Sequence, residues 1–269
     1  MPTVEANGQT IYYEEHGEGE PLLCVGGLAQ TTLAWIPQVQ SFSERHRLVI
    51  FDNRDVGQSS QVQGDYELAD MAQDALALAD GLGLESFHLL GVSMGGAIAQ
   101  EIALAAPERI RTLTLVVTFP SAGRWGRQLG ESWSARRLKL TREEHIDELM
   151  LLNFSEEWFE NEEAVRTLRE MMLAEPHPQS PEAFGRQLRA SARHNAVDRL
   201  GSLTMPVHVI GGERDLLVPV WKSREIAELI PGAKLTVLPG APHGLSLERA
   251  PEFNQVVLDF IAERAPAAA

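Results

Sequence analysis

Short runs of mostly apolar residues recur along the chain, separated by longer amphipathic segments. The runs lie at Pro21–Val25, Leu48–Phe51, Phe87–Leu90, Leu113–Val117, Val207–Ile210 and Leu235–Leu238. Apolar runs of this length are typical of parallel strands that are covered on both faces. An earlier segment, Gln9–Tyr13, follows the turn pair Asn7-Gly8, which favours a β-hairpin.

Between the predicted strands, apolar residues recur at the spacing of an amphipathic helix. These predicted helices lie at Leu68–Leu82, Ser93–Ala106, Val220–Ile230 and Pro251–Ala262. Strands that alternate with helices form parallel sheets, because each helix returns the chain to the same edge of the sheet. The pattern therefore predicts an α/β protein, with a mostly parallel central sheet covered by helices on both faces.

Residues 119–199 interrupt this alternation. The segment has no convincing strand, and its helix-like stretches lie at Arg142–Leu152, Glu162–Leu173 and Pro181–Arg193. We therefore expect residues 1–118 and 200–269 to form one core domain, and residues 119–199 to be a helical insertion. The Ala-Pro-Ala-Ala-Ala end predicts a disordered tail.

Composition restricts the classes of partner. A chain of 269 residues with 44% hydrophobic content can bury one large core. The net charge of −15 argues against nucleic acid, which proteins bind through basic patches. We expect no membrane partner and a cytoplasmic location, because no apolar run could span a bilayer and the N-terminus lacks a signal-like pattern. The single cysteine, Cys24, lies in an apolar run and excludes an intramolecular disulfide.

The strongest motif is Gly91-Val92-Ser93-Met94-Gly95-Gly96, directly after a predicted strand and before a predicted helix. In this context G-x-S-x-G indicates a nucleophile elbow. Residues two before and two after the serine crowd one another there, so Gly91 and Gly95 must lack side chains. The turn exposes the Ser93 hydroxyl and places the Met94 N–H at a helix N-terminus, where backbone donors favour negative charge. The alternative is a tightly packed glycine-rich turn without chemistry.

Over nearly its full length the chain resembles the α/β-hydrolase fold superfamily, in its serine esterase and enol-lactonase branch. Ser93 matches the family nucleophile. The segment Asp52–Ser59 resembles the family's D-x-R-G-x-G-x-S segment, Gly212–Pro219 resembles its acid turn, and Pro239–His243 resembles its histidine loop. The chain order of serine, aspartate and histidine agrees with the family.

A serine hydroxyl becomes nucleophilic when a base lies within hydrogen-bond reach and an acid orients that base. His243 is the expected base, because it follows a predicted strand in a loop that contains glycine and proline. His88 and His208 lie at or within strands, where a packed or hydrogen-bonded role is expected. Asp215 is the expected acid because it lies just past a strand; the alternative is a turn aspartate that caps a helix.

An oxyanion hole needs two backbone donors aimed at the developing charge. Met94 N–H is one, and the resemblance implies Leu28 N–H as the other. The chain departs from the family twice. Gly26-Gly27 stands where the family usually has His-Gly, which opens this loop, and Asp55 stands where the family usually has glycine.

The resemblance also implies that residues 119–199 form a helical cap over the nucleophile. Gly27 and the tryptophans Trp125, Trp133 and Trp158 are candidate pocket residues, although cap aromatics more often lie in the core of the cap. Four arginines between residues 124 and 137 could bind a substrate carboxylate, with solvated surface as the default interpretation.

The expected function is hydrolysis of a carboxylic ester of a small or medium-sized substrate, through an acyl-enzyme and without metal or organic cofactor. One alternative is a lactonase resembling enol-lactonases, or a C–C bond hydrolase of aromatic degradation. A third possibility, from another class, is a ligand-binding module on a hydrolase scaffold. The expected partner is a small-molecule ester or lactone, and both a monomer and a homodimer remain open.

Overall fold

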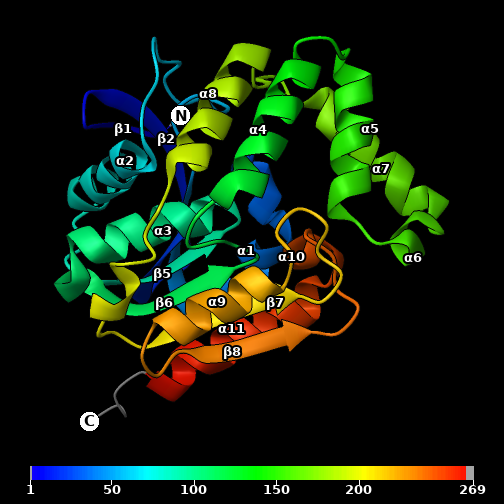
Figure 1. Ribbon diagram of the computed structural model, residues 1–269. Coiled ribbons are helices and arrows are strands. Elements are labelled where there is room, and N and C mark those ends of the chain that lie inside the picture. Colours follow the sequence, from blue (N-terminus) through cyan, green and yellow to red (C-terminus); the bar gives the residue numbers. More distant parts are fainter. Residues whose placement is uncertain (1, 265–269) are drawn as a thin grey trace.

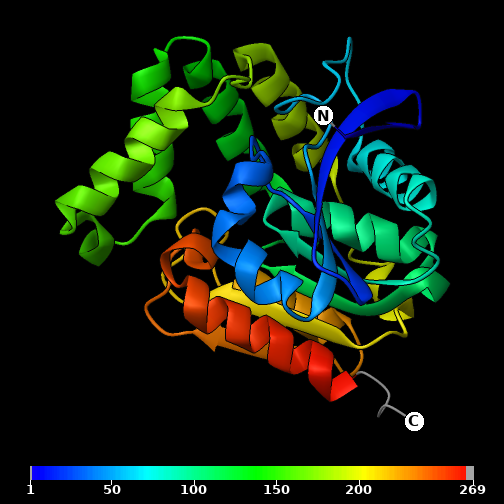
Figure 2. The same ribbon diagram turned by 180° about the vertical axis from the view of Figure 1, so that it is seen from behind.

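One sheet of eight strands runs through the centre of the molecule (Figures 1 and 2). The computed structural model describes residues 2–264, so the tail predicted at residues 265–269 lies outside the described residues. The strands are β1 (Thr3–Ala6), β2 (Gln9–His16), β3 (Glu20–Val25), β4 (His46–Phe51), β5 (Phe87–Val92), β6 (Ile110–Val116), β7 (Val207–Gly212) and β8 (Lys234–Leu238). Their order across the sheet is β1-β2-β4-β3-β5-β6-β7-β8. Only the β1–β2 and β2–β4 pairs are antiparallel, which confirms the predicted mostly parallel sheet.

The predicted hairpin is present at the N-terminal edge. Ala6 pairs with Gln9 across the turn, and Asn7 and Gly8 both have positive φ, at 50° and 74°. Positive φ at both central residues is what a two-residue type I′ turn requires, and asparagine followed by glycine meets it at least cost.

Helices cover both faces of the sheet. They are α1 (Ile36–Ser43), α2 (Leu68–Gly81), α3 (Met94–Ala105), α4 (Gly123–Arg137), α5 (Arg142–Asn153), α6 (Glu156–Phe159), α7 (Glu162–Ala174), α8 (Pro181–Arg193), α9 (Trp221–Leu229), α10 (Leu245–Glu248) and α11 (Ala250–Arg264), with short 3₁₀ turns at Thr32–Trp35, Pro107–Arg109 and Leu200–Ser202. None of the helices within residues 2–264 combines the length and apolarity needed to cross a bilayer.

The two hydrophobic cores explain why the strands are continuously apolar. Leu23 and Val25 of β3 pack with α2, α3 and α9 on one face, whereas Leu22 and Cys24 pack with α1 and α11 on the other. Successive side chains of a strand point to opposite faces, so a strand covered on both sides needs apolar residues at every position.

Helices α4 to α8 all lie between β6 and β7, and they gather to one side of the sheet, where α4 packs along α8 (Figures 1 and 2). Within residues 119–199 the only strand-like pairing is an isolated bridge between Ser121 and Asn195. The expected helices α5, α7 and α8 are confirmed. Helix α4 was not predicted, because three glycines at 123, 126 and 130 weaken its helical propensity. That residues 119–199 form a separate cap domain stays a prediction.

A charged cluster joins the end of this insertion to α3. Glu101 accepts hydrogen bonds from both terminal nitrogens of Arg199 and lies 3.2 Å from the Nδ1 of His194. Burial by itself would raise the pKa of Glu101, but the hydrogen bonds from His194 and Arg199 outweigh it and lower the pKa to about 2. The carboxylate therefore stabilises the folded state while it is charged.

We expect Glu101→Gln to lower the free energy of unfolding at pH 7 by about 3 kcal/mol, the equivalent of this pKa shift. A depressed folded-state pKa stabilises the native state above the unfolded pKa, and that contribution disappears as the pH falls from about 4.5 to about 2. Urea unfolding of both proteins between pH 7 and pH 2.5 measures the difference. A difference in the free energy of unfolding that stays constant across this pH range would contradict the stabilising role of the Glu101 carboxylate.

Candidate active site

Ser93 lies in a strained turn between β5 and α3. Its backbone has φ 55° and ψ −120°, a conformation that side-chain-bearing residues rarely adopt. A Cβ on Gly91 would lie 2.3 Å from Gly95 O, and a Cβ on Gly95 would lie 2.1 Å from Val25 O. The predicted steric need for both glycines is therefore confirmed.

Hydrogen bonds hold the turn on both sides of the serine. The Ser93 N–H donates to Val116 O at 2.9 Å, and the Thr118 hydroxyl donates to Ser93 O at 2.7 Å. Both partners lie at the carboxyl end of β6 or just beyond it. The neighbouring strand therefore fixes the backbone from which the serine hydroxyl projects.

Three side chains from separate strand ends meet in one hydrogen-bonded chain. His243 Nε2 lies 3.0 Å from Ser93 Oγ, and His243 Nδ1 lies 2.7 Å from Asp215 Oδ2. The Asp215 and His243 side chains are buried, whereas Ser93 is partly exposed. With the proton on Nδ1, the ring donates to the carboxylate, and its Nε2 is free to accept the serine proton.

The loop after β7 fixes the second oxygen of Asp215. Leu217 N–H and Val218 N–H each donate to Asp215 Oδ1 at 2.8 Å, which leaves Oδ2 for the histidine. The carboxylate thus has a hydrogen-bond partner at both oxygens and a fixed orientation. Asp215 does not cap the next helix, α9, whose N-cap residue is Val220 and which has no side-chain cap hydrogen bond.

Leu28 and Met94, the predicted oxyanion donors, both border the same cavity as Ser93. Met94 is the first residue of α3, where a backbone N–H has no acceptor within the helix. Gly27 lies beside the nucleophile, since a Cβ there would be 3.3 Å from Ser93 Cβ. The structure therefore brings all three residues close to Ser93; the oxyanion-binding role of Leu28 and Met94 and the pocket role of Gly27 stay predictions.

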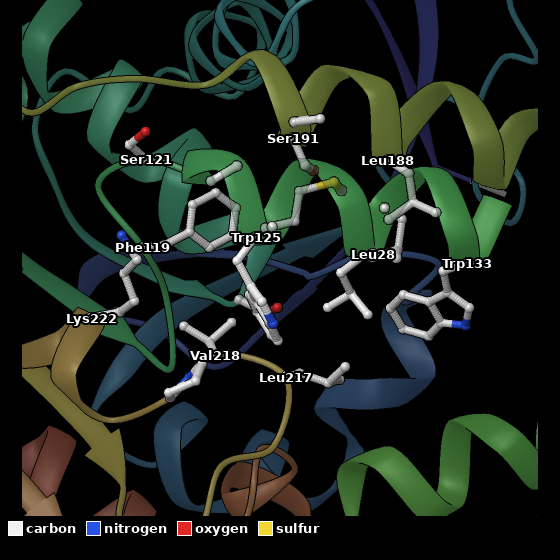
Figure 3. Close-up of a pocket in the computed structure, with 18 of the residues that line it drawn as sticks. Leu28, Phe119, Ser121, Trp125, Trp133, Leu188, Ser191, Leu217, Val218 and Lys222 are labelled. Carbon is white, nitrogen blue, oxygen red and sulfur yellow. The ribbon is translucent and has the colours of Figure 1, made fainter.

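Ser93 borders an apolar cavity of about 110 Å³, and Figure 3 shows side chains that line it. Leu28, Phe119, Trp125, Trp133 and Leu188 form much of its wall, with Leu217 and Val218 opposite. The lining residues with a hydroxyl or ammonium group are Ser93, Ser121, Ser191 and Lys222. The Lys222 charge is compensated, because its Nζ lies 2.9 Å from Glu225 and over the Trp221 ring.

The three candidate tryptophans differ in their position relative to the cavity. Trp125 and Trp133 both line the cavity, Trp125 at its exposed rim and Trp133 buried in its wall. The expectation for Trp158 is wrong, because this residue does not line the cavity. It stacks on Phe154 at 4.2 Å between ring centroids and packs against Phe159, within the core of the insertion.

Several lining residues were not expected from the sequence. Leu217, Val218 and Pro219 follow Asp215 directly, so the acid turn itself supplies one wall. Their position after the acid is the signal that could have identified them. Leu188 and Ser191 come from α8, and their place in the wall depends on how α8 packs on α4, which local sequence does not reveal.

His88 and His208 lie within strands and are hydrogen-bonded there, as expected. His88 Nδ1 lies 2.8 Å from the Thr112 hydroxyl, and His208 Nε2 lies 2.8 Å from the Thr236 hydroxyl. Burial lowers the pKa of His208 to about 4, so its ring is neutral at pH 7. Within residues 2–264, no cluster of three or more histidine, cysteine or carboxylate side chains could hold a metal ion.

With this geometry established, comparison with known proteins shows the family. Residues 20–250 match the model of the alpha/beta hydrolase fold. The chain belongs to the α/β-hydrolase fold family. The match extends from β3 through the histidine loop, so it includes Ser93, Asp215 and His243.

Similar proteins carry several different names. The chain is 28% identical over 98% of its length to a protein of Azorhizobium caulinodans named "Putative carbamate hydrolase RutD", of which 99% is covered. It is 28% identical over 94% of its length to a Mycobacterium tuberculosis protein named "Putative non-heme bromoperoxidase BpoC", of which 97% is covered. The solved enol-lactonase of Burkholderia xenovorans superposes with a TM-score of 0.87, at 25% identity over 97% of this chain and 100% of that one. These names describe different activities, so they do not agree on one reaction or one substrate.

We expect Gly95→Ala to lower the free energy of unfolding by about 3 kcal/mol or more, because its methyl group would overlap the Val25 carbonyl. Gly201→Ala is the matched control, since a Cβ there would lie 3.6 Å from Leu229 O, an ordinary contact. Urea unfolding of both variants measures the effect. Wild-type stability for Gly95→Ala would contradict the packing of this turn.

Proposed function

We propose that this α/β-hydrolase cleaves neutral carboxylic esters of small or medium size, with Ser93 as nucleophile, His243 as general base and Asp215 as the orienting acid. The observation that carries the proposal is the hydrogen-bonded chain from Asp215 through His243 to Ser93, opening onto an apolar cavity. A binding module would need the cavity but not this chain of proton-transfer groups.

In the first step Ser93 Oγ attacks the ester carbonyl carbon while its proton passes to His243 Nε2. The carbonyl oxygen becomes an oxyanion, which the N–H groups of Leu28 and Met94 stabilise. The C–O bond to the alcohol then breaks, and the alcohol leaves with the proton from Nε2. Asp215 stabilises the imidazolium throughout this step.

In the second step a water molecule gives its proton to His243 Nε2 and attacks the acyl-enzyme carbonyl. The bond to Ser93 Oγ breaks, the serine regains its proton from the histidine, and the carboxylic acid leaves. Every proton transfer uses the one histidine.

The cavity indicates a substrate of modest size and no charge. Its volume of about 110 Å³ is smaller than the roughly 150 Å³ cavity that holds benzene, so it suits a short acyl chain. Its lining is mostly carbon, and Lys222 is already paired with Glu225. Trp125 is 57% exposed at the rim, so a longer alcohol group can extend past it toward solvent.

A lactonase is the second candidate, because the same steps open a cyclic ester and the overall similarity to the Burkholderia enol-lactonase supports it. Cleavage of C–C bonds remains a further alternative. The small-molecule partner and the cytoplasmic location belong to the same proposal.

We expect p-nitrophenyl butyrate to be hydrolysed, and both Ser93→Ala and His243→Ala to lower kcat by about 10³-fold or more, because triad members act as a unit. A fluorophosphonate probe should add its mass to the peptide that contains Ser93. Ser121→Ala, a second hydroxyl at the cavity, is the matched control and should keep its labelling. Labelling that survives Ser93→Ala would contradict the nucleophile assignment.

A panel of substrates distinguishes an esterase from a lactonase. We expect kcat/KM for acetyl and butyryl esters to exceed that for octanoyl esters by about tenfold or more, because a longer acyl chain overfills the cavity. Enol-lactones and vinylogous diketones complete the panel. A higher kcat/KM for a lactone than for every ester would favour the lactonase, and turnover confined to diketones would favour C–C cleavage.

A further inference from the structure

The loop that carries Leu28 contains two adjacent glycines, so its conformation has to be fixed from outside. Asn53 Nδ2 donates to Gly26 O at 3.0 Å, and the Gln30 side chain accepts from Gly27 N–H at 2.7 Å. Gln30 N–H donates to Gly27 O at 3.3 Å. In a trans peptide the N–H points opposite to the C=O, so this last bond turns Leu28 N–H away from Gln30.

The far end of the same loop is held by the helical insertion. Gln187, in α8, is fully buried, and its Oε1 accepts from Ala29 N–H at 3.1 Å. Ala29 has φ 60°, a left-handed conformation that alanine adopts at a cost. The bond to Gln187 compensates for that cost and fixes the peptide directly after Leu28.

Gln187 is itself held at each of its polar atoms. Its Nε2 donates to Arg54 O at 3.1 Å, and its Oε1 also accepts from Gln179 Nε2 at 2.9 Å. The side chain therefore bridges two loops of the core, the one after β3 and the one after β4.

The neighbouring residue of α8 anchors the helix to the second of these loops. Arg186 donates through Nε and Nη2 to the two oxygens of Asp55, each at 2.8 Å, and Asp55 is fully buried. Tyr66 hydroxyl and Val62 N–H also donate to this carboxylate. Asp55, the departure from the family's usual glycine, has φ 68° and so keeps the left-handed backbone that glycine favours.

The loop after β4 is also held by helix α2 of the core. Arg54 makes a two-pronged ion pair with Asp74 of α2, with both contacts at 2.6 Å. The Arg54 and Asp74 side chains are buried. Core and insertion thus share a continuous set of buried and partly buried hydrogen bonds that ends at Ala29.

We propose that Gln187 is a positioning residue, which holds the Leu28 N–H in the orientation that binds the oxyanion, with the Asp55–Arg186 ion pair setting its place. This inference rests on the proposed ester hydrolysis by Ser93. It makes the insertion part of the catalytic geometry as well as a wall of the cavity.

The test compares Gln187→Met, similar in size but without the hydrogen bonds, with wild type. We expect kcat per active site titrated with fluorophosphonate to fall by about 10–100-fold, somewhat less than removal of an oxyanion donor costs. The Ki of phenylboronic acid, which forms a tetrahedral adduct on the serine, should rise by a similar factor. KM should change by less than about threefold, because the ground-state carbonyl depends less on the oxyanion donors.

Two further variants separate positioning from folding. Arg189→Met removes an exposed ion pair between α8 and Asp65 and should leave kcat and Ki unchanged. Gln187→Glu keeps an acceptor for Ala29 N–H and should recover most of the lost kcat, even if its melting temperature is lower.

A kcat per titrated site and a boronate Ki within threefold of wild type for Gln187→Met would overturn this inference alone. So would a loss confined to KM, or Gln187→Glu as slow as Gln187→Met. Wild-type protein without ester turnover and without labelling at Ser93 would overturn the proposed function, and this inference with it.

Discussion

The close approach of two backbone segments at the turn that carries Ser93 governs the arrangement of the site. The start of α3 lies directly against the end of β3, where a Cβ on Gly95 would meet both Val25 O and Gly26 O. Such an approach is possible only because Gly95 has no side chain. As a result, the loop after β3 begins beside Ser93, and the neighbouring parallel strands deliver their own loops to the same edge.

This edge also concentrates backbone strain. Ala29, Asp55, Ser93 and Val117 all have positive φ, and each lies in a loop that follows a strand, either directly or within a few residues. Conformations of this kind cost about 1–3 kcal/mol each and persist where surrounding contacts determine them. Here Gln187 accepts a hydrogen bond from Ala29, and Arg186 forms an ion pair with Asp55. The insertion therefore stabilises the strained, positive-φ conformations of these two core loops.

The insertion forms hydrogen bonds with two different loops of the site. On one side Gln187 holds the loop that contains Leu28. On the other, Gly244 N–H, next to His243, donates to Asn153 O at the end of α5, at 2.7 Å. Both contacts join backbone groups of the core to the insertion, so the packing of α4 to α8 is coupled to the positions of the loops that carry Leu28 and His243.

The sequence by itself determined most of the strands, the helices that alternate with them, the mostly parallel sheet and the triad candidates. Apolar runs covered on both faces have a recognisable pattern, and the glycines around Ser93 are required by local sterics, so these features are encoded in short segments. The order of Ser93, Asp215 and His243 along the chain, each at a predicted strand end, then implied that they meet.

Only the tertiary structure decided what surrounds them. Trp133 lines the cavity and Trp158 does not, although both are tryptophans of the same insertion, because their places depend on how its helices pack. The role of Asp55 depends on Arg186, which is 131 residues away along the chain. Contacts over such separations arise from packing, which no local pattern of apolar and polar residues records.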